Sequence, residues 1–302
     1  MISLTDIKQF FKGNIFLNEP LNRFTTFRIG GEADYLVEPA DSDDLLSMVK
    51  YCNSKSMPFY VMGNGSNILI SDEGIRGVVI NLETGFNYIR NEDGVIVSGA
   101  GAKLAKFVDF CIQNNLSGVE MIAGIPATVG GALIMNAGCY GGEMSTYVTE
   151  VTVIRSEKIL NLSKEACGFV YRNSNLKDTV IMQAKFKLPA GDKDELLKLR
   201  KEFLLKRNES QPVEIPNAGC IFKNPKGTHA AVLIEECGLK GMSVGGAMVS
   251  PKHANFIVNN GAATANDVLE LVRKIQKTVK DTKGIELNLE VKLVGFEKEL
   301  AH

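Results

Sequence analysis

The sequence predicts an α+β protein with more than one domain. Segments with the two-residue period of strands alternate with segments of helical period along the whole chain. The chain has 302 residues, of which 45% are hydrophobic and 23% are charged. At ~150 residues per domain, this length allows two domains or three small ones, each with a core of its own. The composition is that of an ordinary globular protein and argues against a disordered or collagen-like chain.

The first half of the chain is predicted to contain helices among short strands. Helices are expected at residues 5–11, 41–55 and 103–115. Asp41 or Ser42 is the expected N-cap of the second helix, because a short polar side chain there can accept a backbone N–H of the first turn. Strands are expected at residues 33–38, 57–62 and 68–70, and the runs that flank Glu92-Asp93-Gly94 predict a β-hairpin.

The second half is predicted to contain short strands, a domain boundary and two capped helices. Strands are expected within residues 148–188, and a charged helix at 193–207. Residues 209–216 carry two prolines and no periodicity, which marks a domain boundary. Later helices are expected at 230–237, before Gly238, and at 266–280, after the N-cap Thr264. A strand is expected at 255–258, and strict alternation at 285–293 predicts another with one polar face.

The charge balance argues against a nucleic acid as partner. The chain has 34 Lys and Arg against 35 Asp and Glu, a formal charge of −1. It therefore has no basic excess to neutralise a phosphate polymer. Any phosphate must be held locally, by backbone N–H groups and a few side chains.

The cysteines and the N-terminus predict a cytoplasmic protein without a metal site. The six cysteines form no Cys-x-x-Cys pair and have no zinc-ligand spacing, and residues 1–12 lack the features of a signal peptide. Free thiols in a reducing compartment are expected. The uncharged run 121–142 is long enough to cross a bilayer, but its glycines, Pro126 and Asn136 would spoil a lipid-facing helix. We interpret it as a buried glycine-rich loop system, with no membrane contact.

Two glycine-rich segments, residues 63–67 and 124–138, have the composition of phosphate-binding loops. Such loops need glycine because the backbone must approach the ligand and direct successive N–H groups at it. A nucleotide or dinucleotide is one interpretation. Tight turns of an α+β protein are the other, and for either loop alone they are at least as good an explanation. Together the two loops favour a ligand.

Neither of the common nucleotide-binding fingerprints is present. Gly63-x-Gly65-x-x-Ile68 lacks the third glycine and leads into a strand. Gly99-x-Gly101-x-x-Leu104 does lie between a strand and a helix, but Leu104 stands where a small residue must let the helix pack. No Gly-x4-Gly-Lys-[Ser/Thr] occurs, so a P-loop is also not expected.

Several motifs in a fixed order carry a resemblance to a known family. They are Thr-Thr-Phe-Arg-Ile-Gly-Gly at 25–31, Gly-Asn-Gly-Ser-Asn at 63–67, the run 124–142, Tyr-Arg-Asn-Ser at 171–174, Ala-Gly-Cys-Ile-Phe-Lys-Asn-Pro at 218–225, the run 238–249, His-Ala-Asn-Phe at 253–256 and Leu-Glu-Val at 289–291. Along nearly its whole length the chain thus resembles the UDP-N-acetylenolpyruvoylglucosamine reductase family. These flavoproteins of bacterial peptidoglycan synthesis are also called UDP-N-acetylmuramate dehydrogenases.

The resemblance implies an FAD-binding fold of the p-cresol methylhydroxylase/vanillyl-alcohol oxidase type with a C-terminal α+β substrate domain. The implied FAD-binding subdomains are residues 1–76, completed by a C-terminal strand at 286–302, and residues 77–208. The implied substrate-binding domain is 209–285. The chain length resembles that of the shorter class of the family, which lacks an extra substrate-covering loop.

The implied reaction has two halves: NADPH reduces FAD, and the reduced flavin gives hydride to C3 of an enolpyruvyl UDP-sugar. Hydride addition builds negative charge toward C2 and the carboxylate, so the site needs a cationic or hydrogen-bonding stabiliser and a proton donor at C2. By motif, the resemblance assigns Arg172 to this charge and Glu290 to the same intermediate or its protonation. It assigns Cys220 to the proton transfer, at a position where the family usually has serine.

Each of these three residues also has a simpler interpretation. In the simpler interpretation, Arg172 forms an ion pair at the surface and Glu290 is a solvated residue of a strand. Cys220 is then a small apolar side chain that is buried in the core. A thiol, with an unperturbed pKa of ~8.5, gives up a proton more readily than an alcohol, so the role of the serine survives the change. A second departure is Ala127, where the family commonly has glycine.

The resemblance also implies cofactor and substrate contacts. The FAD contacts are Asn64, Gly65, Ser66, Asn67, Gly124, Ile125, Thr128, Gly130, Gly131, Asn136, Gly138 and Arg207. The substrate contacts are Tyr171, Asn224 and His253, and a structural role is the alternative for His253. FAD is expected to be non-covalent, NADPH to be the co-substrate, and no obligate protein partner is evident. Two alternatives remain: a flavin or nucleotide-sugar binding protein without turnover, and a flavin oxidase of the same superfold.

Overall fold

The computed structural model describes residues 4–296, and its backbone contacts divide the chain into two compact units. Unit 1 comprises the residues up to Asn18, Asp34–Asn64 and Gly77–Leu205. Unit 2 comprises Glu19–Ala33, Gly65–Arg76 and the residues from Lys206 on. Each unit has its own hydrophobic core of buried side chains. The predicted α+β fold class is confirmed, whereas the three-domain division of the chain stays a prediction.

A four-stranded sheet has the order β1-β2-β5-β3, and the unit boundaries fall inside three of its strands. The strands are β1 Asn14–Pro20, β2 Glu32–Glu38, β3 Phe59–Met62 and β5 Ile75–Asn81. Two helices belong to the same part of the chain, α1 Leu4–Ile7 and α2 Ser42–Ser54. The sequence predicted β2, β3 and α2 but not β1, whose burial pattern does not alternate.

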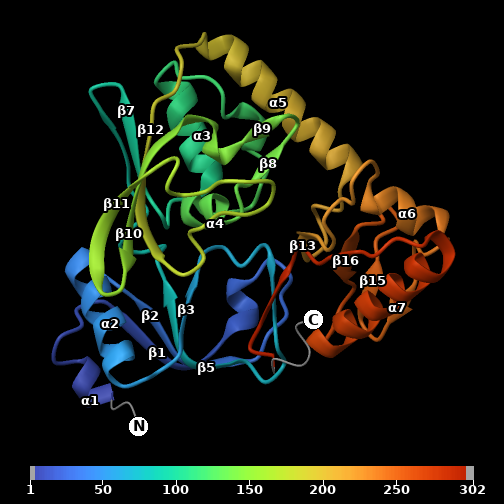
Figure 1. The fold of residues 1–302 in the computed structure, drawn as a ribbon, viewed down its shortest axis with the longest axis horizontal. Helices are drawn as coiled ribbons and strands as arrows, with labels where there is room; N and C mark the ends of the chain where they lie inside the picture. Colours follow the sequence, from blue (N-terminus) through green and yellow to red (C-terminus); the bar gives the residue numbers. More distant parts are fainter. Residues whose placement is uncertain (1–3, 297–302) are drawn as a thin grey trace. The chain divides into compact units, whose positions relative to one another are not determined.

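Unit 1 also contains a five-stranded antiparallel sheet (Figure 1). Its order is β11-β10-β12-β7-β6, with β6 Ile89–Glu92, β7 Val95–Gly99, β10 Val148–Arg155, β11 Lys158–Ser163 and β12 Val180–Phe186. Asp93 and Gly94, between β6 and β7, both have positive φ, the signature of a tight hairpin turn. The predicted hairpin and the predicted strands within 148–188 are therefore confirmed. Helices α3 Leu104–Gln113 and α4 Val129–Ile134 pack together, and α4 also packs on β7 and β12.

The run 121–142, predicted to be a loop system, also contains short regular elements. They are η2 Glu120–Ile122, α4, β8 Gly138–Cys139 and β9 Gly142–Glu143, followed by η3 Met144–Tyr147. The helix α4 forms despite two glycines because Thr128 caps it, accepting the Gly131 N–H at 3.3 Å. The charged helix α5 Lys193–Ser210 follows later in the chain.

Unit 2 contains a four-stranded sheet of order β13-β16-β15-β14 with two helices beside it (Figure 1). The elements are η1 Leu21–Phe24, β4 Ile68–Ile70, β13 Asn217–Cys220, α6 Ala230–Glu236, β14 Ser243–Val244, β15 Ala247–Val249, β16 Phe256–Asn259, α7 Ala265–Lys283 and β17 Lys292–Val294. Helix α7 begins with a capping box of Thr264 and Asp267 and ends at Gly284 with φ of 69°. The predicted N-cap Thr264 is confirmed. No helix among the described residues is both long enough and apolar enough to cross a membrane.

The predicted strand at 285–293 is largely wrong. Only Lys292–Val294 forms a strand, β17, which pairs in parallel with β4. The alternation does reflect burial, because Leu287 and Val291 are each 3% exposed. Their neighbours, however, follow an irregular backbone with one isolated bridge, from Leu289 to Phe222. Residues 297–302 of the predicted C-terminal strand lie outside the described residues.

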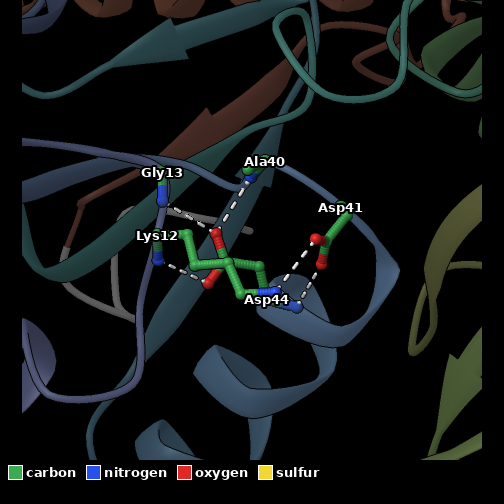
Figure 2. A network of polar contacts seen from close by, with 5 residues as sticks. All are labelled: Lys12, Gly13, Ala40, Asp41 and Asp44. Atoms are coloured by element: carbon green, nitrogen blue, oxygen red, sulfur yellow. Dashed lines mark hydrogen bonds and ion pairs between the residues drawn. The ribbon is translucent and has the colours of Figure 1, made fainter.

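The start of α2 is held by the carboxylate of Asp44, which is 1% exposed (Figure 2). Its oxygens accept the backbone N–H groups of Lys12, Gly13 and Ala40, each at 2.9 Å. Asp41, the N-cap, accepts the Asp44 N–H at 2.9 Å, and this backbone bond lowers the pKa of Asp41 below its usual range. Asp44 therefore joins the backbone at Lys12 and Gly13 to the backbone at the start of α2.

We expect Asp44→Ala to lower the free energy of unfolding by at least about 3 kcal/mol, because three N–H groups lose a charged acceptor. Asp44→Asn should lose less, since one amide oxygen still accepts. Asp43→Ala is the matched control: Asp43 is exposed on the same turn, and its loss should cost less than about 1 kcal/mol. Urea denaturation measures all three. Equal stability of the two alanine variants would contradict the bracing role of Asp44.

Candidate active site

The second glycine-rich loop of unit 1 is held by the segment that precedes α3. Leu104 N donates to Ala127 O, Val129 N to Ala102 O, and Gly130 N to Ala100 O, each at 2.8 Å. A Cβ on Gly130 would lie 2.9 Å from Cβ of Ala100, so glycine is needed for this close approach. The backbone of residues 127–130 is thus fixed along residues 100–104.

The start of the first glycine-rich loop lies against this second loop. A Cβ on Gly63 would lie 2.2 Å from the hydroxyl oxygen of Thr128, closer than any side chain could come. Asn64 Nδ2 donates to the carbonyl of Pro126 at 2.6 Å. The structure therefore brings together Gly63 and Asn64 with residues 126–128.

The residues of this loop pair fit the phosphates of a flavin dinucleotide. The backbone N–H groups of Asn64 and Thr128 donate to no oxygen of the described residues, and Thr128 is 2% exposed. A buried N–H without an acceptor is costly, and a phosphate oxygen would satisfy it. Gly124, Ile125 and Gly131 lie half-buried in the same loop.

Arg172 lies in unit 1, where its side chain is held by the β8–β9 hairpin. Its guanidinium donates to the carbonyl of Gly138 at 2.5 Å and lies 5.0 Å from the centre of the Tyr171 ring. Its φ of 52° is uncommon for a residue other than glycine. Such a backbone persists only where the surroundings enforce it, which is frequent at functional sites. Tyr171 is 50% exposed.

Asn136 braces the backbone next to Arg172. Its Nδ2 donates to Glu143 Oε2 at 2.9 Å and to the carbonyl of Val170 at 3.2 Å. Its Oδ1 accepts the Ser145 N–H at 3.1 Å. Because both Nδ2 hydrogens have protein acceptors, the side chain ties the hairpin to the segment that carries Tyr171 and Arg172. A direct flavin contact from Asn136 stays a prediction.

In unit 2 the backbone brings Cys220 and Glu290 onto adjacent segments. Cys220 ends β13 opposite Phe256 of β16. The next carbonyl, Ile221 O, accepts the N–H of Glu290 at 2.8 Å. Phe222 is in turn bridged to Leu289. Two residues that are 70 positions apart in the sequence are therefore neighbours along paired backbone.

A buried amide that sequence reasoning missed holds this arrangement. Asn255, 3% exposed, accepts the Phe222 N–H at 3.0 Å and donates to the Phe222 carbonyl at 2.8 Å. Its own carbonyl accepts the Ile221 N–H at 2.9 Å. Asn255 lies within the His-Ala-Asn-Phe motif, which was the available signal for it.

The remainder of the first glycine-rich loop, Gly65 to Asn67, belongs to unit 2 and contacts this part of it. Asn67 Nδ2 donates to the Glu290 carbonyl at 3.2 Å, and Asn67 O accepts the Lys292 N–H at 3.0 Å. Gly65 has φ of 59°, and a Cβ there would lie 2.3 Å from Phe24 O. Ser66 O lies 3.9 Å from the Cβ position of Gly219. Gly65 to Asn67 thus line the backbone that carries Cys220 and Glu290.

The two predicted substrate contacts of unit 2 differ in their surroundings. The His253 ring packs edge-on against Phe256, with ring centres 4.7 Å apart, and its Nδ1 accepts the Asn255 N–H at 3.3 Å. Burial lowers the pKa of His253, so its imidazole is neutral near pH 7. Asn224 is exposed, and its Oδ1 accepts the Ala230 N–H at 3.0 Å.

Arg207, one of the predicted FAD contacts, lies half-buried in the last turn of α5.

Comparison with known proteins matches two family models to this chain. A family model described as FAD binding domain matches residues 33–158, and one described as UDP-N-acetylenolpyruvoylglucosamine reductase, C-terminal domain matches 211–294. The chain is 44% identical to UDP-N-acetylenolpyruvoylglucosamine reductase from Caldanaerobacter subterraneus subsp. tengcongensis, over 97% of this chain and 98% of that protein. It is 44% identical to the enzyme of the same name from Heliobacterium modesticaldum, over 97% and 94%.

A solved structure supports the same relationship. The crystal structure of UDP-N-acetylenolpyruvylglucosamine reductase from Thermus caldophilus matches with 38% identity and a TM-score of 0.81. The match covers 94% of this chain and all of the other. The fold and these matches define a flavoprotein oxidoreductase with FAD as its cofactor. More narrowly, the chain belongs to the UDP-N-acetylenolpyruvoylglucosamine reductase family. The resemblance inferred from the motifs is confirmed, and membership of the shorter class stays a prediction.

Proposed function

We propose that the chain reduces UDP-N-acetylglucosamine enolpyruvate to UDP-N-acetylmuramate with NADPH, and that Arg172, Cys220 and Glu290 carry the second half of the reaction. Its family membership supports the reaction. The observation that carries the residue assignment is the backbone bond from Glu290 to Ile221, which places the glutamate beside the segment of Cys220. The proposed location is the cytoplasm, where the six free cysteines would stay reduced.

Each residue has one task in this proposal. FAD, when bound, would supply the redox chemistry that connects NADPH with C3 of the enolpyruvyl group. Arg172 stabilises the negative charge that then builds at C2 and the carboxylate. The Cys220 thiol gives its proton to C2 and regains one from solvent. Glu290 assists the same charged intermediate or its protonation. Tyr171, Asn224 and His253 are proposed to contact the UDP-sugar.

The FAD contacts are proposed to come from both glycine-rich loops and the residues around them. They are Asn64 to Asn67, Gly124, Ile125, Thr128, Gly130, Gly131, Asn136, Gly138 and Arg207. The backbone N–H groups of Asn64 and Thr128, which donate to no oxygen within residues 4–296, support this assignment. The UDP-sugar and NADPH are the proposed partners.

An anaerobic two-step experiment tests the function. The purified protein should be yellow, NADPH should bleach the flavin, and the enolpyruvyl UDP-sugar should then restore its colour with formation of UDP-N-acetylmuramate. A bound flavin that the UDP-sugar fails to reoxidise would indicate a binding protein without turnover. Fast reoxidation by oxygen together with no response to the UDP-sugar would indicate a flavin oxidase.

We expect the FAD to be held without a covalent bond, because the proposed contacts are backbone groups and polar side chains. Denaturation with acid or heat should therefore release all of the flavin into the supernatant. Chromatography of that supernatant should identify FAD. Flavin that stays with the precipitated protein, or FMN alone in the supernatant, would contradict this expectation.

A further inference from the structure

Lys103, which no motif assigned to the site, is linked through the amide of Asn64, in the part of the first glycine-rich loop that belongs to unit 1, to the second glycine-rich loop. Its Nζ lies 2.5 Å from Oδ1 of Asn64 and 2.6 Å from Oε1 of Glu83. The other end of the Asn64 amide, Nδ2, donates to the Pro126 carbonyl at 2.6 Å. A continuous chain of polar contacts therefore runs from Glu83 through Lys103 and Asn64 to the second loop.

The chemistry of these groups allows only one orientation of the Asn64 amide. A lysine ammonium can only donate hydrogen bonds, and a backbone carbonyl can only accept them. The oxygen of Asn64 must therefore face Lys103, and its NH₂ group must face Pro126. Without the ammonium, Asn64 could rotate its amide and lose the contact with the second loop.

The position of Lys103 is itself fixed by the motif Gly99-x-Gly101-x-x-Leu104, which the flavin fold does not use as a dinucleotide fingerprint. A Cβ on Gly101 would lie 2.0 Å from the Leu82 carbonyl, so this turn lies directly on the backbone next to Glu83. Two residues later, Lys103 forms a backbone bridge with Thr128. The motif thus places Lys103 between its carboxylate partner and the second loop.

We propose that Lys103 is a positioning residue for FAD: it orients the Asn64 amide and so holds the two loops at the separation that the phosphates require. The inference rests on the proposed assignment of both loops to FAD. Its carboxylate partner Glu83 anchors the ammonium. An alternative is that Lys103 attracts the phosphates directly by its charge, in which case Glu83 would oppose binding.

The test measures the dissociation constant of FAD from the full-length protein after removal of its flavin, by quenching of flavin fluorescence. Lys103→Met should weaken binding at least about tenfold, the loss of one charge-assisted hydrogen bond. Asn64→Ala, which keeps its backbone N–H, should weaken binding similarly. The double variant should bind no more weakly than Asn64→Ala alone, because Lys103 acts through that amide.

Glu83→Ala separates positioning from direct attraction by the sign of its effect. If Lys103 must be anchored, this variant binds FAD more weakly. If the charge itself attracts the phosphates, the variant binds FAD more tightly. Lys106→Met is the matched control, because Lys106 is exposed on α3 and its loss should leave the dissociation constant unchanged.

Three results would overturn the inference: FAD affinity of Lys103→Met equal to that of Lys106→Met, additive effects of Lys103→Met and Asn64→Ala, or tighter binding by Glu83→Ala.

Thermal unfolding of each flavin-free variant shows whether it is folded. Should Lys103→Met fail to fold, Lys103→Gln and the Glu83→Ala comparison give the same decision. If Asn64→Ala also leaves affinity unchanged, the proposed role of the Asn64 amide fails as well, whereas an unsubstituted protein that binds no FAD would refute the assignment of the loops to FAD. If Asn64→Ala alone weakens binding, only the role of Lys103 fails.

Discussion

Arg172→Ala is expected to accept electrons from NADPH at a nearly normal rate and then to reoxidise about 10²–10³ times more slowly with the enolpyruvyl substrate. The guanidinium is proposed to stabilise charge that exists only after hydride has reached C3, so the first half-reaction does not need it. Its hydrogen bond to the Gly138 carbonyl and its contact with the Tyr171 ring hold it in one orientation. A stabiliser that is already oriented costs no reorganisation when the charge develops.

Anaerobic stopped-flow measurement of the two half-reactions separates these effects. Arg172→Lys should recover only part of the second rate, since an ammonium lacks the planar fork that matches a carboxylate. Arg155→Ala is a suitable control, because Arg155 is a half-buried arginine of the same unit that donates to the carbonyl of Asn175. Equal slowing of both half-reactions by Arg172→Ala would refute the assignment to the substrate charge.

The parts of the fold that sequence could predict are those determined by nearby residues. The capping box of Thr264 and Asp267 lies within four residues, and the β6–β7 turn depends on Asp93 and Gly94 alone. The strand β1, by contrast, has no alternating burial pattern, and its place depends on its partner β2. The alternation at 285–293 reports burial correctly but not pairing, because the backbone there bonds to Ile221 and Lys223 instead of forming a regular ladder.

In the candidate site, too, nearby residues could be predicted from the sequence and contacts between distant residues could not. Motifs identified Cys220 and Glu290, but periodicity could not show that Glu290 donates to the carbonyl next to Cys220. Lys103 could not be assigned to the site from the sequence, for a different reason. Its role depends on contacts with Glu83 and Asn64, 20 and 39 positions away, and on a glycine motif that matches no known nucleotide-binding fingerprint. Contacts between side chains distant in sequence leave no local pattern from which to infer them.

Cys220→Ala is expected to leave flavin reduction by NADPH intact and to abolish most product formation, because no thiol remains to protonate C2. Cys220→Ser should recover part of the activity, since a hydroxyl can occupy the same place at the end of β13. The measurement is the yield of UDP-N-acetylmuramate in single turnover with enzyme reduced beforehand. The brace from Asn255 bonds only the backbone of Ile221 and Phe222, so neither substitution removes it.

Alkylation gives an independent test of Cys220, because a thiolate reacts with iodoacetamide and serine does not. Burial raises the pKa of Cys52 and Cys167 to about 11 and that of Cys111 to about 12, so these thiols should react slowly. Iodoacetamide should inactivate the natural protein faster as the pH rises, because the thiolate is the reactive form, and bound substrate should protect it. Cys220→Ser should be spared, which also controls for Cys139 and Cys237. Full turnover by Cys220→Ala would instead show that the thiol only packs at the end of β13 and that another group or a water protonates C2.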